Sequence, residues 1–165
     1  MAAAVVVALA ALAGMIAIVV RLRADESSTG RLSFAASTPA AAPFAEFSEA
    51  RVALGARCLR VLVASSAAQR VQGLRDVRSI APYDGMLFVF PADTAARFTM
   101  ANTPLPLDAT FFSAQGTPVD DVVMKPCPQG SDSTCPAYAS KARYRYALER
   151  PAGSGPSSGA LGACA

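Results

Sequence analysis

The sequence of 165 residues contains no histidine. Histidine is the usual general base of Ser-His-Asp and Cys-His nucleophile systems, and it is the commonest nitrogen ligand of zinc. Its absence excludes those classes of enzyme and every histidine-ligated metal site. Any catalysis would have to depend on carboxylates, thiols, tyrosine or lysine, so we expect a binding or structural role before an enzymatic one.

The sequence also lacks the cysteine spacing of a zinc site and the dense basic run of many nucleic-acid-binding proteins. Zinc ligands are typically separated by roughly two to four residues, and no two of the cysteines are that close: Cys58, Cys127, Cys135 and Cys164. The 15 lysines and arginines, which give a net charge of +3, are spread along the chain. We therefore expect no metal, no cofactor and no nucleic-acid partner.

What the sequence does have is a long apolar run near its start, from residue 2 to residue 20. As a helix this run would be roughly 28 Å long, which is close to the thickness of the hydrocarbon core of a bilayer. We expect residues 1–23 to form an N-terminal transmembrane anchor, and a cleaved signal segment is the alternative. The protein is then expected at the cell membrane, or secreted if the segment is cleaved.

Residues 24–50 are rich in alanine, serine, proline and glutamate, and they show no hydrophobic period. Such a composition is typical of a flexible linker, and a coil of this length spans about 30 Å. We expect this segment to tether a folded domain that comprises residues 51–165.

Cys127 and Cys135 bracket the polar sequence PQGSDST, which is rich in turn-forming residues. A short loop of this kind closes easily, so the two cysteines are predicted to form a disulfide, and the pairing of Cys58 and Cys164 stays open. Disulfides persist in oxidising compartments, which favours a domain on the extracytoplasmic side of the membrane. Reduced thiols in a domain that faces the cytoplasm are the alternative, since Arg21 and Arg23 follow the apolar run.

Short apolar segments predict a mainly β domain of the sandwich or open-barrel type with one short helix. Strands are expected at residues 58–64, 85–91, 109–113, 118–124 and 144–151, and the second of these is apolar enough to be buried on both faces. Ser66, with Gln69 three residues later, predicts the start of the helix, and Gly73 predicts its end. Gly116 is expected to adopt a positive φ in a hairpin turn.

The sequence FTMANTPLPLD, residues 98–108, has two interpretations. Pro104 and Pro106 interrupt any strand, so the segment can be a rigid corner in which polar side chains bond to the backbone. It can also be one wall of a pocket for a small ligand or a peptide. The candidate ligand residues are Met100, Asn102, Thr103 and Asp108.

Five short motifs in a fixed order resemble the bacterial and archaeal family known as domain of unknown function 192. The motifs are QGL (72–74), GMLFVF (85–90), FTMANTPLPLD (98–108), PCPQGSDSTCPAY (126–138) and ALERPAG (147–153). The resemblance extends from about residue 51 to the C-terminus. It implies a compact, mainly β domain, often carried behind a signal or an anchor, with no established activity.

The sequence departs from the pattern of that family at three places. Thr99 replaces an aromatic residue and Ala101 replaces a basic one, while Ala163 stands where the closing turn of the family carries an acid. The chain ends shortly afterwards, so we expect the last strand to be short or absent.

These observations leave two classes of function. The first is a membrane-tethered extracytoplasmic module of the cell envelope that binds a small ligand or an envelope protein, or has a structural role. The alternative is an envelope hydrolase that uses Asp108 and Glu149 as its carboxylate pair. The hydrolase requires both carboxyl groups in one open pocket.

Overall fold

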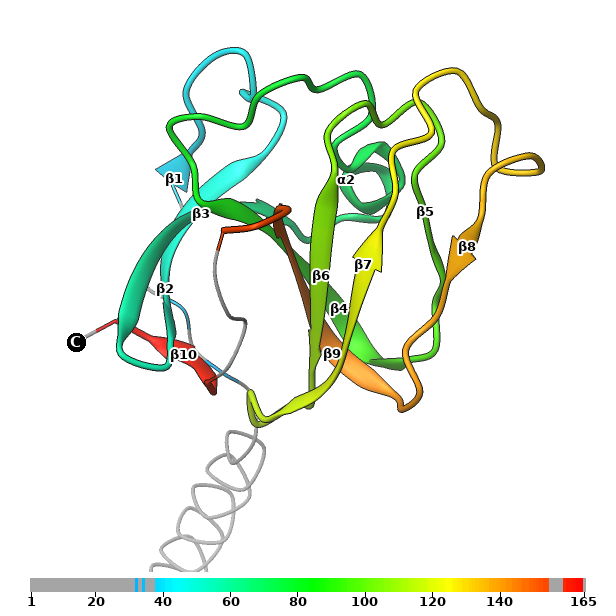
Figure 1. Cartoon of the computed structure of the whole chain (residues 1–165). Coiled ribbons are helices and arrows are strands. Elements are labelled where there is room, and N and C mark those ends of the chain that lie inside the picture. Colours follow the sequence, from blue (N-terminus) through cyan, green and yellow to red (C-terminus); the bar gives the residue numbers. More distant parts are fainter. Residues whose placement is uncertain (1–31, 33, 35–37, 155–158, 165) are drawn as a thin grey trace, which may run out of the picture. The chain divides into compact units, whose positions relative to one another are not determined.

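The computed structural model describes residues 32, 34, 38–154 and 159–164 (Figure 1). The predicted membrane anchor, residues 1–23, lies outside these residues. Within the described part of the chain, no helix combines the length and the apolar character needed to cross a membrane.

Most of the described chain forms one large open sheet of eight strands with the order β1-β2-β3-β4-β9-β6-β7, in which β10 also pairs with β2. Its strands are β1 (Thr38–Pro39), β2 (Ser48–Leu54), β3 (Arg57–Ala64), β4 (Gly85–Thr94), β6 (Leu107–Phe112), β7 (Pro118–Met124), β9 (Tyr144–Pro151) and β10 (Leu161–Ala163). A small second sheet pairs β5 (Phe98–Thr99) with β8 (Ala137–Tyr138). Strands β1, β2 and β10 lie at one end of the domain and β5 and β8 lie at the other (Figure 1).

Helix α2 (Ala67–Gln72) lies between β3 and β4, which are parallel to each other. The capping box predicted from the sequence is present: the Gln69 backbone N–H donates to Ser66 Oγ at 3.1 Å, and the Ser66 N–H donates to Gln69 Oε1 at 2.9 Å. Gly73 follows the helix with a φ of +49°, which a residue with a Cβ rarely adopts. The predicted helix is therefore confirmed at both of its ends.

The first half of strand β4 is buried on both faces of the sheet, as the apolar run at residues 85–91 predicts, whereas residues 89–91 of that run are partly or fully exposed. In β4, Met86 and Phe88 belong to one core cluster, while Leu87, between them, belongs to another on the opposite face. All three side chains are at most 2% exposed. The prediction of a mainly β domain with one short helix is confirmed for the described residues.

The hairpin predicted around Gly116 and the short last strand are both present. Strands β6 and β7 are antiparallel neighbours, and Gly116 in the turn between them has a φ of +80°. The last strand, β10, has only three residues and pairs with β2.

The folded domain begins before residue 51, which corrects the boundary predicted from the sequence. Strand β1 and the start of β2 precede that residue, and the side chains of Phe44 and Phe47 are only 4% and 3% exposed. Still earlier, Leu32 and Phe34 pack against the second core cluster. Composition favoured a linker, but burial of a few large apolar side chains outweighs the flexibility of the alanines and serines around them.

Polar contacts hold the same early segment on the sheet. The Glu49 carboxylate accepts hydrogen bonds from Arg60 Nη2 and from the Tyr83 hydroxyl, each at 2.7 Å. The Tyr83 hydroxyl in turn accepts from the Ala41 N–H at 3.0 Å. The segment before residue 51 is thus part of the domain.

Two disulfides join the four cysteines. Cys127 pairs with Cys135, as the short polar loop between them predicts, with their Cα atoms 6.1 Å apart. Cys58 pairs with Cys164, 106 residues later, and their Cα atoms are 5.6 Å apart. The second bridge fastens the C-terminal end of the domain to β3.

Candidate functional site

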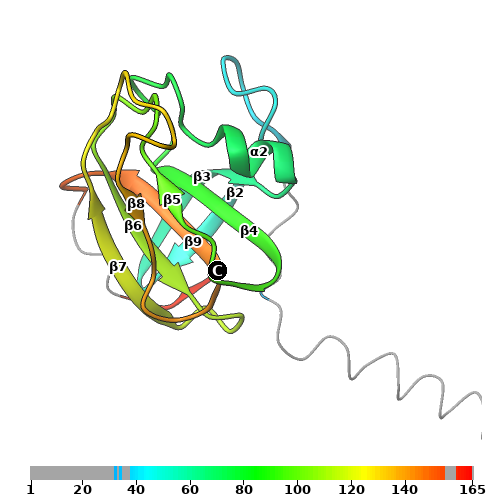
Figure 2. The same ribbon diagram turned by 90° about the vertical axis from the view of Figure 1, so that its right-hand side faces the viewer.

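A cavity of about 550 Å³ opens between helix α2, strands β4 and β9, and the segment around β5. This volume is within the range of small-molecule binding sites, which is about 300–1,000 Å³. Figure 2 shows β5 and β8 in front of the large sheet, with α2 beside β4. The apolar part of the lining is formed by Leu74, Phe88, Phe90, Phe98, Met100 and Leu107.

One buried carboxyl group lines this cavity, and it belongs to Glu149 of β9; the other carboxyl of the lining, that of Asp132, is exposed. On the sheet, Glu149 is opposite Met86 of β4 and Ala109 of β6, both of which are 0% exposed. Glu149 itself is 4% exposed, and among the described residues no group donates a hydrogen bond to its carboxyl. Burial raises the pKa of Glu149 to about 8, so the side chain is a neutral acid at pH 7.

Asp108 does not meet Glu149, which corrects the predicted carboxylate pair. In the β6–β9 register, Ala109 is opposite Glu149 and Asp108 is opposite Arg150. Because neighbouring residues on a strand point to opposite faces, the Asp108 and Glu149 side chains lie on different sides of the sheet. Asp108 Oδ2 instead accepts the backbone N–H of Gly153 at 3.2 Å.

The segment FTMANTPLPLD is both a corner and a wall of the cavity. Met100 and Thr103 line the cavity and are 1% and 4% exposed. The Thr103 N–H donates to the Met100 carbonyl at 2.8 Å, and Thr103 Oγ1 donates to the Ala101 carbonyl at 3.3 Å. The Thr103 hydroxyl is therefore engaged inside the corner.

Asn102 lies on the outer side of this corner, and its side chain is exposed. Its φ is +56°, and its carbonyl accepts the Asp76 N–H at 2.7 Å. Of the four predicted ligand residues, the structure thus brings Met100 and Thr103 to the cavity. Asn102 and Asp108 make backbone contacts elsewhere.

We expect Asn102→Ala to destabilise the domain by about 1 kcal/mol, because alanine tolerates a positive φ less well than asparagine does. Asn102→Gly is the matched control and should be close to neutral, since glycine adopts this conformation without strain. Urea unfolding of both variants measures the difference. Equal losses in the two variants would show that the asparagine side chain, and not the backbone conformation, matters here.

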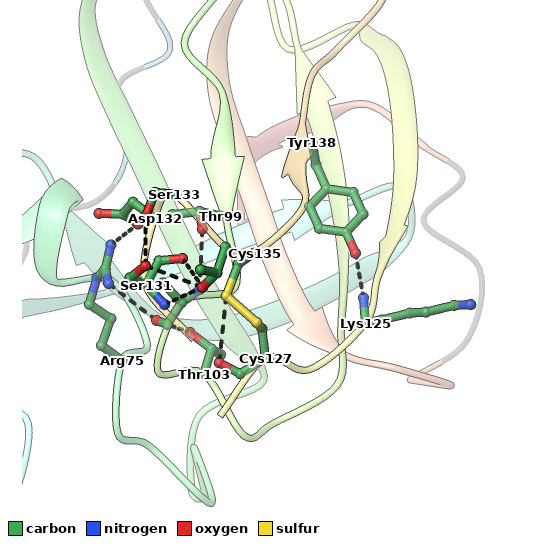
Figure 3. The surroundings of a disulfide bond; sticks show 12 residues. Arg75, Thr99, Thr103, Lys125, Cys127, Ser131, Asp132, Ser133, Cys135 and Tyr138 are labelled. Atoms are coloured by element: carbon green, nitrogen blue, oxygen red, sulfur yellow. Dashed lines mark hydrogen bonds and ion pairs between the residues drawn. A yellow bond between two sulfur atoms is a disulfide. The ribbon is translucent and has the colours of Figure 1, made fainter. Parts of the chain in front are cut away.

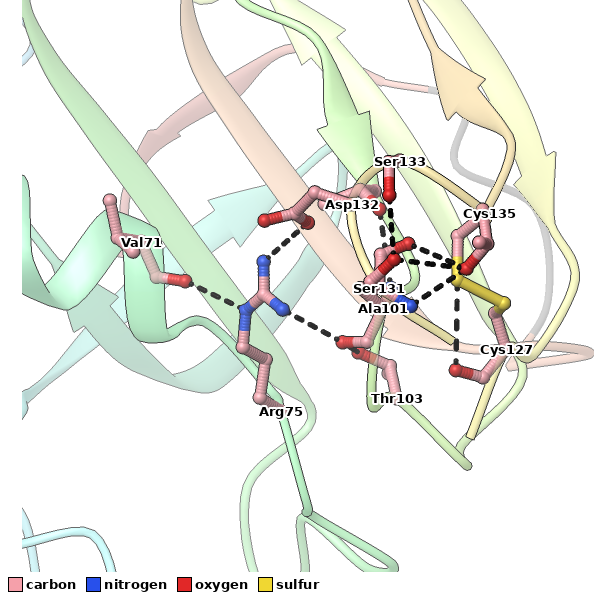
Figure 4. Close-up of polar contacts among 11 residues, drawn as sticks. Val71, Arg75, Ala101, Thr103, Cys127, Ser131, Asp132, Ser133 and Cys135 are labelled. Atoms are coloured by element: carbon pink, nitrogen blue, oxygen red, sulfur yellow. Dashed lines mark hydrogen bonds and ion pairs between the residues drawn. A yellow bond between two sulfur atoms is a disulfide. The ribbon is translucent and has the colours of Figure 1, made fainter. Parts of the chain in front are cut away.

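Arg75 joins three parts of the cavity rim. Its guanidinium donates to the carbonyl of Val71 in helix α2 at 3.1 Å and to the carbonyl of Ala101 in the corner at 3.2 Å. It also forms an ion pair with Asp132 at 2.7 Å (Figure 4). These contacts fasten the helix, the corner and the loop that carries Asp132 to one another.

The Cys127–Cys135 disulfide closes the loop that carries Asp132 (Figure 3). Gly130 lies so close to both sulfur atoms that a Cβ at this position would overlap them. At the base of the loop, the Cys127 N–H donates to the Thr103 carbonyl at 3.1 Å. The disulfide therefore holds the loop next to the corner that walls the cavity.

Two further arginines line the cavity, Arg70 and Arg97. Arg70 Nη1 donates to the carbonyls of Ser65 and Val89, and the guanidinium lies 5.1 Å from the centre of the Phe90 ring. Arg97 Nη2 donates to the Ala137 carbonyl at 3.2 Å. Within the described part of the chain, neither guanidinium bonds to a carboxylate.

Sequence comparison confirms the resemblance carried by the five motifs. The model of the domain of unknown function 192 family, described as "Uncharacterized ACR", matches residues 50–159. The chain belongs to this family. No curated protein matches it in sequence.

Two solved structures resemble this member of the domain of unknown function 192 family. One is a protein of unknown function from Novosphingobium aromaticivorans, with 20% identity and a TM-score of 0.60, covering 72% of this chain and 83% of that one. The other is a protein from Sinorhizobium meliloti provisionally described as a transcription regulator. It has 28% identity and a TM-score of 0.57, and the match covers 80% of this chain and 96% of that one.

One departure from the pattern of the domain of unknown function 192 family falls on the cavity itself. Thr99, which stands in place of an aromatic residue, lines the cavity. A larger aromatic side chain at this position would take up part of the space. Ala101 stands in place of a basic residue and has no charge, and its side chain is 0% exposed.

Sequence reasoning identified Glu149, Met100 and Thr103 but missed the arginines of the rim. Arg97 directly precedes the FTMANTPLPLD segment, and this adjacency was the one local signal for it. Arg70 and Arg75 lie in and after helix α2, and only the fold brings them to the cavity.

The arrangement does not contain the carboxyl pair expected for the hydrolase alternative, within the described residues. A glycosidase of the usual type needs two carboxyl groups on either side of the bond that it breaks. In the described residues the cavity has one deep neutral acid, Glu149, and its other carboxylate, Asp132, is paired with Arg75 at the rim. An apolar interior with a few polar groups is typical of a ligand-binding pocket.

Proposed function

We propose that this chain is an extracytoplasmic binding domain, tethered to the cell membrane by residues 1–23, which holds a small, largely apolar ligand in the cavity beside helix α2. The observation that carries the proposal is the apolar cavity of about 550 Å³ with the single buried carboxyl of Glu149 in its lining. An apolar ligand in this space would bury its own apolar surface against the aromatic rings of β4 and β5, and burial of apolar surface favours binding by about 25 cal/mol per Å².

The two disulfides support a location of the domain on the extracytoplasmic side of the membrane. All four cysteines are bonded, and disulfides persist in oxidising compartments. The apolar run at residues 2–20 supports the tether, because it has the length of a membrane span.

Binding of the neutral fluorescent probe N-phenyl-1-naphthylamine tests the proposal. We expect its fluorescence to rise on titration with the purified protein, because the probe enters an apolar environment. Ala96→Trp, at the edge of the cavity, should weaken binding by at least about tenfold, since the indole would occupy the space of the probe.

Ala92→Trp is the matched control, because Ala92 is an exposed alanine near the end of β4, four residues before Ala96, and does not line the cavity. It should bind the probe as the unmodified protein does. If the probe does not bind, or if the two tryptophan variants bind it equally well, the cavity is not a binding site for apolar molecules.

A further inference from the structure

We propose, building on the binding function above, that the ligand of the cavity is an amphipathic anion: an apolar chain or ring that ends in an acidic group. The apolar part would lie against the phenylalanines and Glu149, and the acidic group would lie at the rim beside Arg70 and Arg97. Both arginines and the phenylalanines line the same cavity.

The interior of the cavity favours an apolar group with no net charge. Phe88, Phe98 and Met100 are buried against it, at 2%, 9% and 1% exposure. Their rings and thioether offer dispersion contacts but no strong hydrogen bonds. A charged group placed among them would lose its hydration without compensation, so the charged end of a ligand must remain at the rim.

The rim has a surplus of positive charge. Three arginines line the cavity, Arg70, Arg75 and Arg97, and Asp132 is the one exposed carboxyl among its described lining residues. Asp132 is engaged by Arg75 at 2.7 Å, and the other Arg75 nitrogens donate to backbone carbonyls. After this pair is subtracted, the charge left at the rim is that of Arg70 and Arg97.

Arg70 is held in place for such a role. Its Nη1 makes both of its described hydrogen bonds, to Ser65 and Val89, and its guanidinium stacks on Phe90 at 5.1 Å from the ring centre. Within the described residues, Nε and Nη2 of Arg70 donate no hydrogen bond. A guanidinium that is positioned by carbonyls and by an aromatic ring, and not neutralised by a carboxylate, keeps its charge and donors for an anion.

Arg97 presents the second cation from the opposite wall. It directly precedes β5 and is exposed, and one of its nitrogens donates to the Ala137 carbonyl of β8 at 3.2 Å. Helix α2 and the connection that leads into β5 thus each bring one arginine to the same cavity. Charge complementarity favours a carboxylate, sulfate or phosphate there, and it disfavours a cationic end group.

Displacement of bound N-phenyl-1-naphthylamine by three ligands of equal chain length tests this inference. Decanoate should displace the probe at a concentration about tenfold lower than decanol does, and decylamine should be weaker than decanol. Charge-assisted hydrogen bonds from arginine to a carboxylate are the reason for the expected order.

Arg97→Gln, Arg70→Gln and their combination identify the groups responsible. Each single variant should weaken decanoate by about threefold to tenfold, the combination should abolish its advantage over decanol, and decanol should bind as before. Arg143→Gln is the matched control, because Arg143 is another exposed arginine that donates to a backbone carbonyl, that of Asp93, but does not line the cavity. It should leave all three ligands unchanged.

The outcomes separate this inference from the proposed function. If decanol and the probe bind but decanoate has no advantage, or if the advantage survives in the combined variant, the amphipathic anion is wrong and the apolar cavity stands. If neither decanol nor the probe binds, both proposals fail. Because Arg70 bonds to two carbonyls, thermal melts of each variant establish that a lost preference does not reflect unfolding.

Discussion

Glu149→Gln is expected to remove a large part of the pH dependence of the folding free energy between pH 5 and pH 8. The pKa of Glu149 is raised to about 8 in the folded protein by burial, whereas an unfolded glutamate titrates near 4.5. Between these values the folded state keeps a proton that the unfolded state releases. The stabilisation is therefore complete below about pH 4.5 and is lost as the pH rises through 8.

The expected size follows from the shift. Each unit of pH in this window costs the native state about 1.4 kcal/mol, so the protein should lose about 2–3 kcal/mol of unfolding free energy between pH 5 and pH 7. Glutamine has nearly the same shape and does not ionise, so the variant should be much less sensitive to pH and more stable than the unmodified protein at pH 8. Urea unfolding at several pH values measures both proteins.

Two other carboxylates, Glu49 and Asp120, also make the folding free energy depend on pH, but in the acid range. Hydrogen bonds lower the pKa of Glu49, chiefly from Arg60, and that of Asp120, chiefly from the Lys141 backbone. Their contributions are lost as the pH falls, in the acid range, and are common to both proteins. Parallel stability curves for the unmodified protein and Glu149→Gln between pH 5 and pH 8 would mean that Glu149 is ionised and solvated in the folded state.

Loss of the Cys58–Cys164 disulfide is expected to cost up to about 4–5 kcal/mol, and loss of the Cys127–Cys135 disulfide about 2.5 kcal/mol. The difference arises because the first bridge spans 106 residues and the second spans 8, so the first removes more conformational freedom from the unfolded chain. Double alanine variants at each pair, unfolded in urea side by side, measure the two costs.

The smaller bridge has a second, local effect that the larger one lacks. It holds the loop that carries Asp132 beside the cavity, so its loss should also weaken binding of the apolar probe. If the variant without the Cys58–Cys164 bridge is no less stable than the variant without the Cys127–Cys135 bridge, the large loop is already constrained in the unfolded state.

Local signals predicted a large part of the fold. The capping box of Ser66 and Gln69, the positive φ of Gly116 and the burial of residues 85–88 on both faces of the sheet each depend on residues close together in the sequence. The Cys127–Cys135 pairing is equally local. Such features are set by backbone geometry and short-range contacts, which a single sequence carries.

Features that depend on distant residues were not predictable in this way. Phe44 and Phe47 look like isolated aromatics in a linker, and only the rest of the core explains their burial. The supposed pair of Asp108 and Glu149 failed because strand register decides which face each side chain takes, and a shift of one residue reverses the answer. The Cys58–Cys164 bridge likewise required the C-terminal strand to be placed beside β2.

In the candidate site, too, some residues were predictable from local sequence and others depend on the fold. Met100 and Thr103 were identified because the segment 98–108 is unusual in itself, whereas Arg70 reaches the cavity from helix α2, about 30 residues earlier in the sequence. Glu149 was noticed as a carboxylate, but its raised pKa comes from burial, which depends on how the strands around it assemble.

A crystal structure of the protein with N-phenyl-1-naphthylamine bound tests the central claim most directly, because it locates the ligand. The account predicts density for the probe between helix α2 and β5, in contact with Phe88 and Phe98 and close to the Glu149 carboxyl. A well-occupied probe elsewhere, such as on the exposed Val123 of β7, with the cavity beside α2 left without it, would contradict the account.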